Sequence, residues 1–158
     1  MECDGALQDN NATTVQPYRP GQRENFVVSA FAKQIIQVKK GLREPILRVG
    51  DIDVTRDFTD VRDIVMAYKV LIERGESGEA YNVCSGKEVM VREILVRLGE
   101  IAGVKVTVVQ DPTLFRSGEQ RRHVGSYCKL RRATGWQPSI EIDHSLGEIL
   151  NHWEKELG

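Results

Sequence analysis

The stretch RDFTDVRDIVMAYKVL, residues 56–71, joins a densely charged start to an apolar helical repeat. Apolar side chains recur at steps of three and four residues, which predicts an amphipathic helix: they are Val61, Ile64, Val65, Tyr68, Leu71 and Ile72. Asp60 and Asp63 are suited to cap its first turn, because a carboxylate accepts hydrogen bonds from the free backbone N–H groups there. Arg56 is unexpected, because cations are disfavoured beside the positive end of a helix dipole. Either Arg56 is a solvated surface charge, or it binds an anion at that place.

Elsewhere the chain alternates apolar segments of strand length with helical repeats. The expected strands are residues 45–50, 79–84 and 105–111, and the expected helices lie between Asn25 and Gly41, between Asp60 and Gly75, over 91–102, over 129–135 and over 142–157. Asn25 is placed to cap the first of these helices. Strands that alternate with helices predict an α/β fold in layers, with partly parallel strand pairing and about five helices.

Composition places the chain among globular proteins. Its 158 residues are 41% hydrophobic and 28% charged, which suits one domain with a sizeable core. We expect residues 1–22, which are polar and aperiodic, to be a poorly ordered lead-in, and residues 23–158 to form the domain. The net charge of −1 argues against nucleic-acid binding, and no apolar run reaches the roughly 18 residues of a membrane helix. Scattered cysteines and the lack of a signal-peptide pattern predict a reducing, cytoplasmic location.

The common catalytic and cofactor motifs are absent from the sequence. It contains no G-x-G-x-x-G turn, no P-loop and no G-x-S-x-G elbow, and its histidines lack metal-ligand spacing. We therefore expect no catalytic residue and no metal site. What remains is a basic segment, residues 116–135, in which six cations and one acid give a net charge of +5. Guanidinium groups match phosphate oxygens. Arg116 lies in an irregular stretch where ligand-binding residues often occur, whereas Arg131 and Arg132 suit a solvated helix face.

Several segments, in one consistent order over residues 17–155, resemble a known family. They are RPGQRENFVVSAFAKQI, LRVGDIDVTRDFTDVRDIVMAY, EAYNVCSGKEV, the Arg116-x-x-Glu119 pair and LRRATGWQP. Together they are similar to the C-terminal, substrate-side half of extended short-chain dehydrogenases of the NAD-dependent epimerase/dehydratase family. The branch resembled most is that of GDP-mannose 4,6-dehydratases and GDP-6-deoxy-4-keto-mannose reductases, and Ala30, where dehydratases tend to carry a lysine, favours the reductases. The resemblance implies partial Rossmann-like layers.

The resemblance also implies roles for five residues in substrate binding. Asn25 and Val27 match the segment that contacts the diphosphate and nucleotide, and Arg56 matches the arginine of the nucleotide-sugar site. Arg116 and Glu119 match the pair that grips the diphosphate and nucleoside. On this reading a bound diphosphate is the anion that Arg56 requires, with the neighbouring helix N-terminus assisting.

The departures from the family concern catalysis. In the family, catalysis depends on a glycine-rich NAD(P) turn and a Tyr-x-x-x-Lys pair, and this sequence has neither. Ser117 replaces a usual proline, Ser126 stands where an aspartate is common, and the QPYRPGQ segment is a shortened version of the family's substrate loop. We therefore expect a GDP-sugar-binding half that is not catalytically competent alone. NADP or NAD would enter only if a partner supplies the missing domain.

An alternative is an oligomerising structural or interaction module with a vestigial ligand site. The apolar faces that pack on the cofactor sheet in the parent fold would otherwise be exposed, and a homo-oligomer or a partner carrying the cofactor domain would cover them. A polyanion-binding role for the basic segment is a third and weaker alternative. The expected partners are thus a GDP-sugar or similar nucleotide and a second chain, without a membrane.

Overall fold

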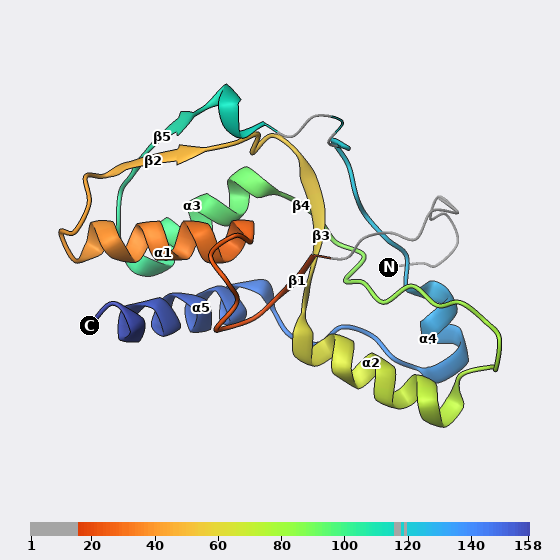
Figure 1. Ribbon diagram of the computed structural model, residues 1–158. Helices are drawn as coiled ribbons and strands as arrows, with labels where there is room; N and C mark the ends of the chain where they lie inside the picture. Colours follow the sequence, from red (N-terminus) through yellow and green to blue (C-terminus); the bar gives the residue numbers. More distant parts are fainter. Residues whose placement is uncertain (1–15, 116–117, 119) are drawn as a thin grey trace.

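The computed structural model describes residues 16–115, 118 and 120–158 (Figure 1). Within them lie five short strands, five α-helices and one 3-10 helix, η1. In chain order they are β1 (Gln16–Tyr18), α1 (Val27–Lys39), β2 (Ile46–Val49), β3 (Thr55–Asp60), α2 (Val61–Arg74), β4 (Glu88–Met90), α3 (Val91–Ala102), β5 (Thr107–Gln110), η1 (Pro112–Leu114), α4 (Cys128–Thr134) and α5 (Ile142–Glu156). The expected α/β class is confirmed. No helix in this part of the chain is both long and apolar enough to cross a membrane.

The strands form two small sheets. One has the order β1–β3–β4, with β1 parallel and β4 antiparallel to β3, and the other pairs β2 with β5 in parallel. In the first sheet Gln16 lies opposite Phe58, and Arg56 lies opposite Val89. The partly parallel pairing expected from the alternation of elements is therefore present.

The apolar core divides into two clusters. Figure 1 shows the helices and strands that carry them. The larger cluster lies where α1, α3 and α5 pack against one another beneath β2 and β5. Its largest fully buried side chains are Ile35, Ile36, Leu47, Ile52, Ile94, Leu98, Leu146 and Ile149. The smaller cluster lies between α2 and α4 and consists of Ala67, Cys84, Tyr127, Leu130 and Trp136. Strand β3 contributes Phe58 to the larger cluster, and α2, which follows β3 directly, contributes Ala67 to the smaller one.

The charged start of the 56–71 stretch differs from the prediction. Residues 56–60 belong to β3 and not to the start of a helix, and all five are buried. Asp60 does cap α2, as predicted, since its side chain accepts a hydrogen bond from the Arg62 backbone N–H at 2.8 Å. Asp63 does not share that role and accepts hydrogen bonds from residues 139 and 140 instead. Buried charges in a strand give no apolar alternation, so periodicity could not reveal β3.

Other boundaries also differ from the prediction. Helix α1 begins after Phe26, which makes no side-chain capping bond, so the expected cap at Asn25 is wrong. Residues 79–84 form no strand, and β4 lies further along at Glu88–Met90. Strand β1 falls within residues 1–22, where no element was expected. Both missed strands contain three residues and are held by pairing with β3, which is a tertiary effect.

Candidate functional site

A pocket of about 650 Å³ lies between the start of α1, the sheet of β1 and β3, and the end of β2. Its wall is apolar over much of its extent, with Val27, Ala30, Phe31, Val49, Ile52, Val54, Val91 and Leu114 among the lining residues. Its polar lining residues are Gln16, Asn25, Gln34, Arg48, Asp51 and Arg56. A volume of this size and a mixed lining are typical of small-molecule sites.

Three predicted site residues meet in this pocket, although they come from separate parts of the chain. Asn25 precedes α1, Val27 is the first residue of α1, and Arg56 belongs to β3. The predicted pair Arg116 and Glu119 lies outside the described residues.

Arg56 is not a solvated surface charge. Its exposed fraction is 6%, and its guanidinium donates a hydrogen bond to the Thr55 backbone carbonyl oxygen at 2.7 Å. Since β3 rises by roughly 3.3 Å per residue, Arg56 stands on the order of 16 Å from the first residue of α2. The predicted conflict with the dipole of that helix therefore does not arise. A buried guanidinium at a pocket wall is a strong electrostatic feature, because a desolvated cation attracts an anion more strongly than a solvated one.

Asp57 follows Arg56 and serves a structural purpose. Successive strand side chains point to opposite faces, and Asp57 is fully buried. Its carboxylate accepts hydrogen bonds from the Ser85 backbone N–H at 2.8 Å, the Ser85 hydroxyl at 2.6 Å and the Gly86 N–H at 2.9 Å. Gly125 N–H donates to it as well, at 3.3 Å. Asp57 thus fixes two remote loops behind the strand that presents Arg56 to the pocket.

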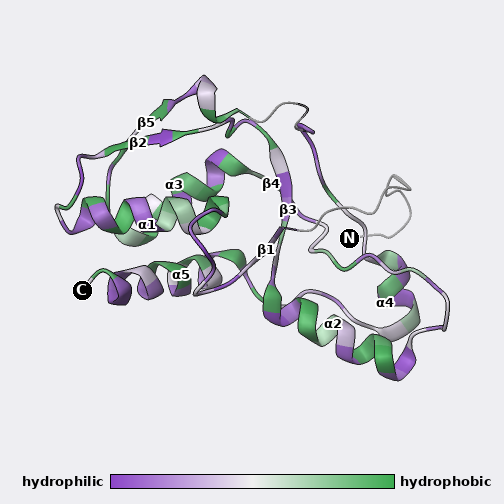
Figure 2. Cartoon of the chain, viewed as in Figure 1, coloured by the Kyte–Doolittle hydropathy of each residue, from purple (hydrophilic) through white to green (hydrophobic). Residues whose placement is uncertain are grey.

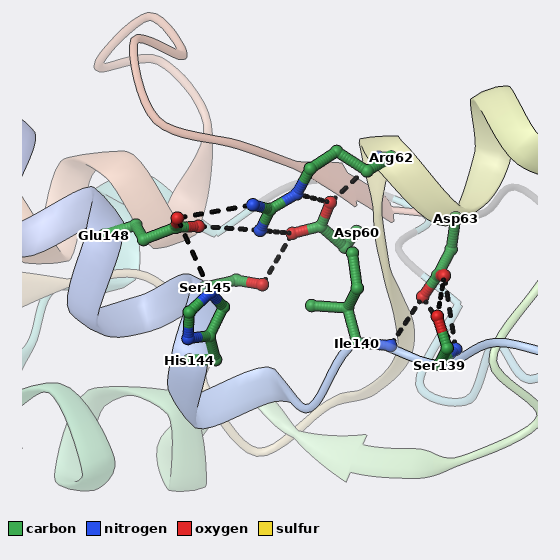
Figure 3. Close-up of polar contacts among 8 residues, drawn as sticks. All are labelled: Asp60, Arg62, Asp63, Ser139, Ile140, His144, Ser145 and Glu148. Atoms are coloured by element: carbon green, nitrogen blue, oxygen red, sulfur yellow. Dashed lines mark hydrogen bonds and ion pairs between the residues drawn. The ribbon is translucent and has the colours of Figure 1, made fainter.

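A second carboxylate cluster anchors β3 to α5 (Figure 3). The Arg62 guanidinium donates to both oxygens of Asp60 at 2.9 Å and to Glu148 at 2.6 Å, while the Ser145 hydroxyl donates to Asp60. Burial acts to raise the pKa of the Asp60 carboxyl. The hydrogen bonds from Arg62 and Ser145 outweigh burial, so the pKa of Asp60 lies below its ordinary value. Figure 3 also shows Asp63 holding Ser139 and Ile140, the segment that leads into α5.

Two buried groups near β3 are poorly suited to acid–base or nucleophilic chemistry. Burial raises the pKa of Tyr18 to about 12. Burial, together with the charge of Asp57, raises the pKa of Cys84 to about 12 as well. Both groups are therefore protonated at neutral pH. Within the described part of the chain no group of three or more His, Cys, Asp or Glu residues could hold a metal ion.

The short helix η1 contributes to the pocket wall. Leu114, the last residue of η1, lines the pocket. Gly50, at the end of β2, approaches η1 so closely that an added Cβ would stand 2.9 Å from the Leu114 carbonyl oxygen. Sequence reasoning missed Gln16, Gln34 and Leu114 as lining residues, because their approach to the pocket depends on packing between separate elements. The only local signal was Gly50, a glycine directly after a predicted strand.

Much of the basic segment is engaged in ion pairs. Arg122 pairs with Glu88 through two hydrogen bonds of 3.0 and 3.1 Å, and Lys129 pairs with Glu79 at 2.6 Å. Arg121 lies 3.5 Å from Asp51. The net charge of this segment is thus partly neutralised by acids from other elements, which weakens the polyanion-binding alternative.

The fold is an α/β domain with a pocket of mixed polar and apolar lining beside its larger core cluster. Residues 7–149 match the family model described as GDP-mannose 4,6 dehydratase, and the chain belongs to that family. It is 49% identical over 138 residues to GDP-6-deoxy-D-mannose reductase of Pseudomonas aeruginosa. This alignment covers 87% of this chain and 45% of the relative. It is 22% identical over 177 residues to GDP-mannose 4,6-dehydratase of Vibrio cholerae, covering 94% of this chain and 45% of that protein.

Solved structures agree with this family assignment. The structure of RMD from Pseudomonas aeruginosa in complex with NADPH has a TM-score of 0.82 and 47% identity, over 90% of this chain and 48% of that one. A UDP-glucose 4-epimerase of Thermotoga maritima, solved with UDP-glucose, has a TM-score of 0.79 and 26% identity, over 90% and 45% of the two chains. The resemblance inferred from the motifs and the Rossmann-like layering are confirmed. This chain spans about half the length of the relatives it matches.

Proposed function

We propose that this chain is the GDP-sugar-binding half of a dehydratase- or reductase-like protein, and that it is not catalytically competent alone. The observation that carries the proposal is the meeting of Asn25, Val27 and Arg56 in one pocket. The family resemblance assigns these three residues to the nucleotide sugar from sequence motifs, independently of the pocket. The buried guanidinium of Arg56 suits a diphosphate, because arginine can donate two parallel hydrogen bonds to phosphate oxygens. The apolar wall suits the flat faces of a base and a sugar.

Arg116 and Glu119 complete the proposed site. They follow η1 in the sequence, and Leu114, the last residue of η1, lines the pocket. In this proposal Arg116 gives the diphosphate a second cation and Glu119 accepts hydrogen bonds from the nucleoside. Two arginines on one diphosphate neutralise most of its charge.

Hydride chemistry requires groups beyond those of this chain. Its 158 residues contain no glycine-rich turn and no Tyr-x-x-x-Lys pair. Helix α1 follows Phe26 and begins with the bulky residues Val27 and Val28. A dinucleotide pyrophosphate needs small residues at such a helix start so that the backbone can approach it. The residues present do not fit NAD or NADP, so no catalytic step is assigned to them.

Thermal unfolding with millimolar GDP, GDP-mannose or NADP tests the proposal. A ligand present at 100 times its dissociation constant stabilises the folded state by about 2.7 kcal/mol, which gives a clear rise in the midpoint. We expect GDP and GDP-mannose to raise the unfolding midpoint and NADP to leave it unchanged. No response to either GDP compound would overturn the proposal.

The second candidate function is an oligomerising interaction module with a vestigial site. It is favoured by the exposed apolar residues of α2, of which Ile72 is 88% exposed. Repeating the unfolding experiment at two protein concentrations separates the candidates. An unfolding midpoint that rises with protein concentration and does not change with any nucleotide favours the oligomerising module.

A further inference from the structure

The loop that precedes α1, residues 19–26, places Asn25 at the pocket and is held by polar contacts. Figure 2 shows this loop as a hydrophilic segment next to helices with apolar faces. Because such a segment buries little apolar surface, hydrogen bonds and ion pairs decide where it lies. Asn25 stands between Gln22 and Val27, the first residue of α1. Contacts that fix Gln22 therefore also limit where Asn25 can meet a ligand.

Ser29, in the first turn of α1, joins this loop to α5. The Ser29 side chain is fully buried. Its hydroxyl donates a hydrogen bond to the Gln22 backbone carbonyl oxygen at 2.6 Å and accepts one from the Trp153 indole N–H at 3.1 Å. The side-chain amide of Gln22 in turn donates to the Pro17 carbonyl oxygen at 2.9 Å. A chain of hydrogen bonds thus runs from Trp153 on α5, through the loop, to β1.

The indole of Trp153 directs the hydroxyl of Ser29 toward the loop. An indole N–H is a donor only, so the Ser29 oxygen must accept from it and send its own proton elsewhere. That proton goes to Gln22. A serine in a helix can otherwise donate to a carbonyl oxygen of the preceding turn, and Ser29 would then release Gln22. Removing the indole N–H should therefore loosen the loop without touching it.

A second contact joins Trp153 to the same loop. The Lys33 ammonium nitrogen lies 5.2 Å from the centroid of the Trp153 ring, which is a cation–π distance, and it forms an ion pair with Glu24. Glu24 directly precedes Asn25. The loop is thus held at Gln22 and at Glu24, and both links lead back to Trp153.

From these contacts we infer that Trp153 is a positioning residue of the nucleotide-sugar site, which acts through Ser29 and Lys33 on the loop that carries Asn25. Among the described residues, Trp153 is not one of those that line the pocket. Its effect on ligand affinity must therefore pass through the loop. Coupling between two sites is reciprocal, so a ligand bound at Asn25 should also stabilise the contact between Trp153 and Ser29. This inference rests on the proposed function, since it concerns the same ligand.

Calorimetric titration of GDP-mannose into Trp153→Phe tests the inference. The substitution removes the indole N–H and keeps an aromatic ring. We expect the affinity to fall by about fivefold or more, because the loop must then be ordered at the moment of binding. Trp136→Phe is the matched control, since the Trp136 indole N–H donates to the Asp63 carbonyl oxygen at 3.2 Å in the smaller core cluster. Its affinity should be unchanged, and equal affinities in the two variants would overturn the inference.

A second pair of variants decides the question if Trp153→Phe does not fold. Lys33 is partly exposed, so Lys33→Gln should fold and lose both the ion pair with Glu24 and the contact with the Trp153 ring. We expect GDP-mannose affinity to fall by about twofold or more. Lys39→Gln is its control, because Lys39 also joins α1 to α5, through Glu154 at 2.9 Å, and the same charge is removed. Equal affinities in these two variants would contradict the positioning role.

Hydrogen exchange at the two indole N–H groups is a readout that a merely structural role would not move. The chain has two tryptophans, so Trp136→Phe assigns the two indole signals in a nuclear magnetic resonance spectrum. We expect GDP-mannose to slow exchange more at Trp153 than at Trp136, because the ligand and the Trp153 bond stabilise the same loop. Equal slowing at both groups would assign the effect to global stability and overturn the inference.

Failure of this inference and failure of the proposed function give different results. If the unmodified chain does not bind GDP-mannose, the proposed function fails and the inference fails with it. If the unmodified chain binds GDP-mannose and Trp153→Phe binds it equally well, only the positioning role of Trp153 fails.

Discussion

Arg56 and Asp57 are neighbours in β3, but they face opposite sides of the strand and have different roles. Arg56 lines the pocket, while Asp57 holds the loops at Ser85 and Gly125 in place behind it. The densely charged motif therefore combines a buried cation at the pocket wall with carboxylates that hold distant segments in place. Removing Arg56 should therefore weaken ligand binding, whereas removing Asp57 should destabilise the fold.

Asp57→Ala should destabilise the fold strongly. The substitution leaves the Ser85 hydroxyl and three backbone N–H groups in a buried site without their acceptor. Because hydrogen bonds to a charged group contribute roughly 1.5–3 kcal/mol each, we expect a loss of about 3 kcal/mol or more in the free energy of unfolding in urea. Asp53→Ala, which removes an exposed ion pair with Arg92, should cost much less, because solvent screens an exposed pair. Similar losses for both variants would show that burial of Asp57 is unimportant.

Arg116→Ala should remove much of the affinity for GDP, whereas Arg132→Ala should leave it unchanged. The family resemblance assigns Arg116 to the diphosphate, while Arg132 is exposed on α4. We expect a loss of about tenfold or more for Arg116→Ala, because a phosphate would lose a charge-assisted hydrogen bond. Calorimetric titration with GDP provides the measurement. Equal losses in the two variants would mean that only general charge matters.

Part of the site could be predicted from the sequence and part could not. Asn25, Val27 and Arg56 lie in motifs that the family resemblance identifies, and they do line one pocket. Gln34 and Leu114 carry no such signal. Their position depends on how α1 and η1 pack beside β2, which local patterns do not specify.

At the scale of elements, the periodic helices could be predicted and β3 could not. Helices α3 and α5 bury regular apolar repeats, so their positions follow from spacing alone. Strand β3 buries Arg56, Asp57 and Asp60, whose partners come from distant segments. Residues 79–84 have a strand pattern but no ladder in the described chain, because a strand needs a neighbour as well as a propensity.

The cap of α2 should make stability depend on pH. The pKa of Asp60 is lowered in the folded state. The contribution of Asp60 to the free energy of unfolding is therefore fully present above the ordinary pKa of about 3.9, and it is lost as pH falls through the lowered value. We expect Asp60→Asn to be less stable than the unmodified protein at pH 7. The difference in urea midpoint should shrink as pH falls below about 4. A difference that stays constant down to pH 2 would contradict the assignment.

The close approach of β2 and η1 provides a test of how the pocket wall is held. In Gly50→Ala the new methyl group would meet the Leu114 carbonyl oxygen at 2.9 Å, so η1 must move. We expect weaker GDP binding, because Leu114 shifts away from the pocket. Gly147→Ala in α5 is the control, since an added Cβ meets nothing within 4 Å there and should stabilise the helix by about 0.5–1 kcal/mol. GDP affinity that is unaffected by Gly50→Ala would exclude η1 from the site.

At the scale of the whole molecule, β3 links two apolar clusters with different surroundings. The larger cluster is enclosed by three helices and the strands above them, and the pocket lies at its edge. The smaller cluster, between α2 and α4, adjoins the exposed apolar side chains of α2, such as Ile72. The pocket and these exposed side chains therefore lie beside different clusters of the core.

The most direct test of the central claim is a calorimetric titration of GDP-mannose into the unmodified chain and into Arg56→Gln. The account predicts one site per chain and a loss of affinity of about tenfold or more in the variant, because the buried cation at the pocket wall is removed. Thermal unfolding of Arg56→Gln without ligand establishes that the variant is folded. Equal affinity in the two proteins, or no binding by the unmodified chain, would contradict the assignment of this pocket to a nucleotide sugar.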